Sequence, residues 1–100
     1  MTNKERQPMP FSVRLCSDKA AFEVKMQHKI SLNMADLERL LKSTKDNEII
    51  INTPHILIFK TKGAEVTMSK NGRMLIKKIE TEKEATEIAN DVLRVLSPII

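Results

Sequence analysis

Apolar and polar side chains alternate in two short segments near the start of the chain, and this pattern predicts two β-strands. Residues 11–17 read Phe-Ser-Val-Arg-Leu-Cys-Ser, and residues 22–27 read Phe-Glu-Val-Lys-Met-Gln. A period of two places the apolar side chains on one face of a strand and the polar ones on the other, as in half-buried antiparallel strands. Residues 17–19, Ser-Asp-Lys, predict a turn between the two strands.

A helix is predicted to follow Asn33. The Asn33 side chain is a good N-cap, and Asp36 places a carboxylate where the helix N-terminus favours negative charge. Leu32 and Leu37 hold the positions of a hydrophobic staple. The rest of the helical signal is one apolar stripe, formed by Met34, Leu37, Leu40 and Leu41.

Three or four further strands are predicted next. Residues 48–51 and 55–60 are rich in Ile and flank Pro54, which marks a bend or a sheet edge because proline cannot donate to a ladder. Gly63 and Gly72 lie in predicted turns, the second within an Asn-Gly pair that favours a hairpin. The strand segments are residues 48–51, 55–60, 65–68 and 73–79.

The last predicted helix has the clearest signal. Thr81 and Glu84 match a capping box, and Pro98 is expected to end the helix. Apolar side chains recur at helical spacing at Ala85, Ile88, Ala89, Val92, Val95, Leu96 and Ile99.

The predicted order of elements is β-β-α-β-β-β-β-α, an α+β fold in which one curved antiparallel sheet carries two helices on one face. We expect residues 1–10 to be a disordered lead and residues 11–98 to form a single domain. Several strands are apolar on both faces, so the face without helices should expose Ile, Leu and Met side chains. Such a patch indicates an interaction surface for a partner or a homodimer, unless the N-terminal hairpin or a sheet edge hides it.

Composition narrows the class of protein. The chain of 100 residues has three Phe, no Tyr and no Trp, which disfavours a single-strand RNA binder built on stacking. One Cys excludes an intrachain disulfide framework and a multi-cysteine zinc site. The sequence has neither a signal peptide pattern nor an apolar run long enough to cross a bilayer, so we expect a cytoplasmic protein without a membrane partner.

Residues with catalytic chemistry are few and scattered. His28 and His55 lie in separate segments without an evident carboxylate partner, and Cys16 falls on the polar face of its strand with no adjacent acid–base group. The sequence has no metal-ligand motif, and its two glycines cannot build a phosphate-cradling loop. We therefore predict a protein that is not an enzyme, with no cofactor, no metal and no evident small-molecule substrate.

Charge is unevenly distributed along the chain. Residues 55–78 carry six Lys and Arg against one Glu, whereas residues 80–91 carry five Asp and Glu against one Lys. A basic strand block predicts salt-dependent contact with an anionic partner, either nucleic acid or protein. The alternative is that lysines near strand edges and hairpins prevent aggregation. The candidate nucleic-acid or partner-binding residues are Lys60, Lys62, Lys70, Arg73 and Lys77.

Residues 66–85 resemble the second half of one TATA-box-binding-protein repeat. The features in common are the Gly72-Arg73-Met74 hairpin, a returning strand, and the Thr81-Glu82 cap of a long helix. The order of elements in residues 22–60 also fits a single repeat. The same pattern is similar to small domains at the tail of adenylyltransferases of thiamine and molybdopterin synthesis.

The resemblance implies the fold and two alternative functions. One is a binding module that uses its open sheet face, with weak and sequence-tolerant nucleic-acid binding as a homodimer. The other is a protein-interaction accessory domain linked to an adenylyltransferase or to sulfur-carrier cofactor synthesis. Two positions differ from the family pattern, because Ser69 stands where the family has a DNA-wedging Phe and Lys78 stands where it has a Gly after the returning strand.

Overall fold

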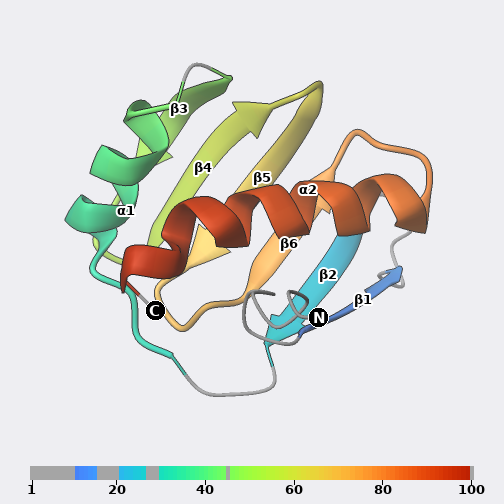
Figure 1. Ribbon diagram of the computed structural model, residues 1–100, viewed down its shortest axis with the longest axis horizontal. Helices are drawn as coiled ribbons and strands as arrows, with labels where there is room; N and C mark the ends of the chain where they lie inside the picture. Colours follow the sequence, from blue (N-terminus) through green and yellow to red (C-terminus); the bar gives the residue numbers. More distant parts are fainter. Residues whose placement is uncertain (1–10, 16–20, 27–29, 45, 100) are drawn as a thin grey trace, which may run out of the picture.

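Six antiparallel strands form one open sheet, and two helices cover one of its faces (Figure 1). The computed structural model describes residues 11–15, 21–26, 30–44 and 46–99. The predicted lead at residues 1–10 and the predicted turn at residues 17–19 lie outside these ranges. The predicted fold class and order of elements are confirmed. The elements are β1 (Phe11–Leu15), β2 (Ala21–Met26), α1 (Met34–Lys42), β3 (Asn47–Asn52), β4 (Ile56–Thr61), β5 (Ala64–Ser69), β6 (Met74–Lys77), α2 (Glu82–Leu96) and a final 3₁₀ turn (Ser97–Ile99).

The strands lie in the order β1-β2-β6-β5-β4-β3, and every neighbouring pair is antiparallel. The chain therefore crosses from β2 through α1 to the far edge of the sheet, and β6 returns to pair with β2. Among the described strands, β1 and β3 are the two edges. Helix α1 packs on β3 and β4, while α2 crosses over β1 and β2 and contacts α1 (Figure 1).

The hydrophobic core lies between the helices and the sheet face that they cover, which we call the inner face. The apolar stripes predicted for the helices point into it, with Leu37, Leu41, Ala85 and Ala89 fully buried. The sheet contributes every second residue of its strands, as the period of two requires. Its fully buried members are Val24, Leu57, Phe59, Val66, Met68, Met74 and Ile76.

Both helices begin at the caps that the sequence predicts. The Asn33 side chain accepts a hydrogen bond from the backbone N–H of Asp36, at 3.0 Å. Thr81 and Glu84 form the reciprocal capping box, and α2 ends at Leu96, just before Pro98. Leu32, the residue before the first cap, is buried as a hydrophobic staple requires.

Two turns position the central strands. Lys62 and Gly63 both have positive φ, +52° and +83°, which is the geometry of a two-residue hairpin whose twist matches the flanking strands. In the next turn only Gly72 has positive φ, and its N–H donates to the Ser69 carbonyl.

One predicted strand is shorter than expected, and one residue of another strand is more exposed than expected. The segment 73–79 ends as a strand at Lys77, because Lys78 adopts a left-handed φ of +67° that turns the chain out of the ladder. In β1, Leu15 was predicted on the apolar face, yet it is 56% exposed, since it lies at the end of an edge strand.

Candidate binding surface on the open face of the sheet

The face of the sheet opposite the helices, which we call the open face, is covered by no described element. Cross-strand register arranges its side chains in rows that run perpendicular to the strands. The middle row begins with Arg14, Glu23 and Leu75 on β1, β2 and β6. It continues with Thr67, Ile58 and Ile51 on β5, β4 and β3.

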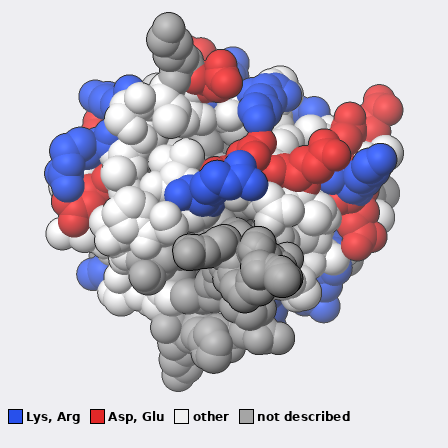
Figure 2. Space-filling model, viewed as in Figure 1, with Lys and Arg blue, Asp and Glu red and all other residues white. Residues whose placement is uncertain are grey.

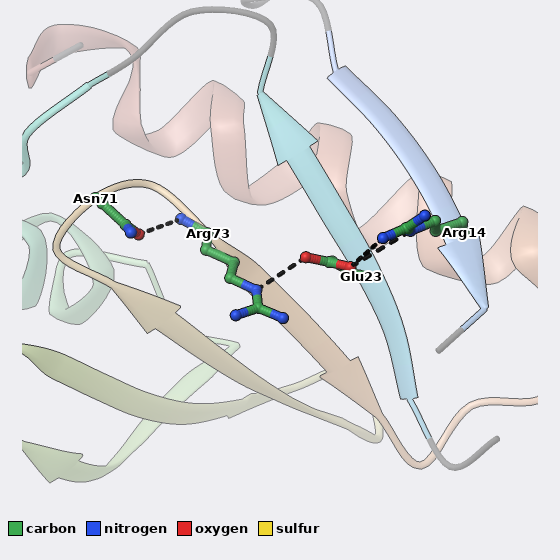
Figure 3. Close-up of polar contacts among 4 residues, drawn as sticks. All are labelled: Arg14, Glu23, Asn71 and Arg73. Carbon is green, nitrogen blue, oxygen red and sulfur yellow. Dashed lines mark hydrogen bonds and ion pairs between the residues drawn. The ribbon is translucent and has the colours of Figure 1, made fainter. Parts of the chain in front are cut away.

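At the β1 end of this row, Glu23 forms an ion cluster with two arginines (Figure 3). Its Oε2 accepts from Arg73 Nε at 2.9 Å, and its Oε1 lies 3.3 Å from Arg14 Nη2. The Glu23 side chain is 10% exposed, whereas the arginines are 56% and 72% exposed. The cluster thus consists of one buried carboxylate held between two guanidinium groups that face solvent.

The pKa of Glu23 reflects this arrangement. Burial acts to raise the pKa, but hydrogen bonds from Arg14 and Arg73 and the charges of both guanidiniums outweigh burial, and the pKa lies below its ordinary value. The carboxylate is therefore ionised at neutral pH. Asn71 supports the cluster indirectly, because its Oδ1 accepts from the backbone N–H of Arg73 at 3.1 Å (Figure 3).

The β3 and β4 end of the open face is apolar. Ile51 is 46% exposed and Ile56 is 39% exposed, while Ile58 is half-buried. We call these three residues the apolar strip. The sequence predicted exposed Ile, Leu and Met on this face. Ile51 and Ile56 confirm exposed Ile, whereas Leu75 is half-buried and Met68 and Met74 are buried on the inner face. A contiguous apolar patch on an otherwise charged sheet is typical of an interaction surface.

A second row of the open face alternates in charge. Glu48, Lys60, Glu65 and Lys77 follow one another across β3, β4, β5 and β6. Each lysine faces at least one glutamate across a strand pair, which is the favourable order for neighbouring charges. Lys60 is therefore balanced by acid on both sides.

The structure brings together only part of the predicted basic set. Lys60, Arg73 and Lys77 lie on the open face, and Lys70 lies in the turn between β5 and β6. Lys62 lies toward α2, where its Nζ bonds to Asp91. Arg73 is engaged by Glu23. The five residues do not form one continuous basic surface.

Sequence reasoning missed Arg14, Glu23 and Lys25 as members of this surface. Their signal was present, because the alternation in the first two strands places all three on the polar face. The missing information was the pairing of β2 with β6, which aligns Glu23 with Leu75. Without that register, the sequence does not show that Arg14 and Arg73 contact the same carboxylate.

The helix side of the molecule carries acidic and basic side chains next to one another rather than a field of one sign (Figure 2). Asp91 bonds to both Lys62 and Arg94. The hydrogen bond from Lys62 lowers the pKa of Asp91 and the same bond raises the pKa of Lys62. These pairs neutralise part of the acidic charge predicted for residues 80–91.

Of the three catalytic candidates, only His55 lies in the described part of the chain. His55 is exposed in the loop before β4, while Cys16 and His28 lie outside the described residues. Within residues 11–15, 21–26, 30–44 and 46–99, no three His, Cys, Asp or Glu side chains are placed to share a metal ion. The same residues include no helix long and apolar enough to span a membrane.

No family model, curated protein or solved structure matches the chain. The resemblance to a TATA-box-binding-protein repeat remains a prediction from residues 66–85.

Proposed function

We propose that the protein is a non-enzymatic binding module that holds a macromolecular partner on the open face of its sheet. The observation that carries this proposal is the apolar strip, where Ile51 and Ile56 are exposed on the face that lies opposite both helices. Burying such a strip against a partner is favourable by roughly 25 cal/mol for each Å² of apolar surface. A partner protein fits this strip better than nucleic acid, because it can bury apolar area.

The test is selection from a library of random 16-residue peptides displayed on phage. The wild-type protein serves as bait, and the selected peptides are then measured for binding to the double variant Ile51→Thr/Ile56→Thr. Threonine keeps the β-branched shape that strands favour while removing apolar surface. Leu15→Thr is the matched control, since Leu15 is even more exposed but lies at the end of edge strand β1. We expect binders that the double variant loses and the control keeps; a pool that binds all three proteins equally would refute the proposal.

Nucleic acid is the second candidate, favoured by one observation. Arg14, Lys25, Arg73 and Lys77 share the open face and are opposed at that end by the buried Glu23 and by Glu65. At most about four phosphate contacts would result, so log affinity against log salt should have a slope of about −3 to −4 on duplex DNA. Lys25→Ala/Lys77→Ala should flatten it by about 2, whereas Lys62→Ala, on the helix side, should leave it unchanged.

A homodimer remains part of the proposal, with β3 as the edge at which two copies would join. Ile50 is 43% exposed on this strand, and Ile51 belongs to the apolar strip. Antiparallel pairing of two β3 strands about a two-fold axis would place both strips side by side. Light scattering at micromolar concentration tests this: a mass of twice 11.4 kDa supports it, and the monomer mass refutes it.

A further inference from the structure

The open face changes in character from one edge of the sheet to the other. Two guanidinium groups and the Lys25 ammonium lie over β1, β2 and β6, whereas the apolar strip extends to β3. Strands in a sheet are about 4.8 Å apart, so the six strands place these two ends about 24 Å from each other. A ligand that uses the whole face must therefore be negative at one end and apolar at the other.

At the cationic end, both arginines have N–H donors that make no hydrogen bond to any described residue. Arg73 gives its Nε to Glu23, and among the described residues its two Nη groups make no hydrogen bond. Arg14 gives Nε and Nη2 to the same carboxylate at 3.4 and 3.3 Å, which leaves Nη1 without a bond to any described residue. Glu23 thus fixes both side chains over the sheet while their outer nitrogens face solvent. Guanidinium groups held in this way favour carboxylates, since they bind them in a fork geometry.

The backbone limits what shape the ligand can have. The four strands between the two edges of the sheet are each paired on both sides; they are β2, β6, β5 and β4. Their backbone N–H and C=O groups therefore cannot bond to an incoming chain. A polypeptide lying on this face must satisfy its own backbone hydrogen bonds, as a helix does. The inner face receives α1 and α2 in the same way. At a rise of 1.5 Å per residue, a helix of about 16 residues spans 24 Å.

Two observations disfavour nucleic acid as the occupant. All three Phe side chains belong to the inner face, where Phe22 and Phe59 are buried and Phe11 packs against the core, so the open face offers no Phe, Tyr or Trp ring on which a base could stack. The cations are also confined to one end, because Lys60 lies between Glu48 and Glu65. A duplex would place phosphates against the apolar strip.

We infer that the ligand of the open face is an acidic amphipathic α-helix of a partner protein, with carboxylates against Arg14, Lys25 and Arg73 and apolar side chains on the strip. This inference rests on the proposed function and names the chemistry of its partner.

Sequencing of the phage pool described above tests the inference. We expect peptides lost on Ile51→Thr/Ile56→Thr to be enriched in Asp and Glu toward one end and in Leu and Ile toward the other. Synthesised members should become helical on binding, seen by circular dichroism. Lys25→Glu should weaken them about two- to five-fold in low salt, the range for one exposed ion pair. Lys83→Glu is the control, because Lys83 is exposed on α2 on the opposite side of the molecule; it should change nothing.

The outcomes separate the inference from the proposed function. Binders that need the apolar strip but are neutral or basic, or that ignore Lys25→Glu, overturn the inference and leave the proposed function standing. A pool that does not discriminate between the wild type and the double variant overturns both. Binding of a 16-base-pair duplex that competes with the selected peptides and is weakened by Lys25→Glu overturns the inference in favour of nucleic acid.

Discussion

Glu23 and Arg73, fifty positions apart in the sequence, form an ion pair in which 2.9 Å separates Oε2 from Nε. The pair joins β2 to the start of β6, two strands that become neighbours only when the chain has crossed the sheet and returned. It therefore fastens the N-terminal hairpin to the rest of the fold. Because the Glu23 side chain is 10% exposed, loss of its partner leaves a carboxylate with little access to water.

Arg73→Ala should lower the free energy of unfolding by about 1–2 kcal/mol, toward the low end of the cost of removing a hydrogen bond to a charged group, because Arg14 still pairs with Glu23. Lys77→Ala is the matched control on the same face, at the other end of β6, and it should change stability by less than about 0.5 kcal/mol. Urea denaturation followed by circular dichroism measures both. Equal stability of the two variants would show that Arg73 does not support Glu23.

Stability should decline at acid pH, and Glu23 should contribute to the decline. Because its pKa is lower in the folded state than the ordinary value of 4.5, folding favours the ionised form. The contribution is fully present above the unfolded pKa and is lost as the pH falls through the folded pKa. Urea midpoints at pH 7 and pH 3 should differ less for Glu23→Gln than for the wild type. An unchanged difference would contradict the assignment.

The sequence was sufficient to predict the helices and strands, but it was insufficient to predict how charged side chains are arranged on the surface. Caps at Asn33 and Thr81 and the period of two are local signals, so helices, strands and their order could be predicted. The placement of Lys62 could not, because its side depends on the handedness of a turn in which both residues have positive φ. The role of Glu23 could not be predicted either, since it depends on a register between strands that the sequence separates by α1 and three other strands.

Gly72→Ala should destabilise the protein strongly, because two effects combine at this turn. The φ of +92° is unfavourable for any residue with a Cβ, and a Cβ there would lie 2.5 Å from Cγ1 of Ile30. We expect a loss of more than about 2 kcal/mol, beyond the 1–2 kcal/mol of a left-handed backbone alone.

Gly63→Ala is the control for this position. Its φ of +83° is similar, but a Cβ there meets nothing within 4 Å. It should show the backbone cost alone, about 1 kcal/mol, in the same thermal or urea melts. Adding Ile30→Ala to Gly72→Ala should recover part of the difference between the two glycines. If Gly63→Ala and Gly72→Ala were equally destabilised, contact with Ile30 would not matter.

Lys78→Gly should stabilise the fold, which is unusual for a substitution that removes a side chain. Lys78 has a φ of +67°, a conformation that costs a residue with a Cβ about 1 kcal/mol or more and costs glycine nothing. Its Nζ lies 3.7 Å from Glu65 Oε1, a long ion pair whose lysine side chain is 63% exposed, and such a pair contributes little. After the greater flexibility of glycine in the unfolded chain is subtracted, we expect a gain of about 0.5–1 kcal/mol.

Lys62→Gly is the comparison, since Lys62 has a similar φ of +52° but bonds to Asp91, and its gain should be smaller or reversed. Urea denaturation of both variants decides the matter: a Lys78→Gly protein no more stable than the wild type would mean that the left-handed backbone at the end of β6 carries no strain.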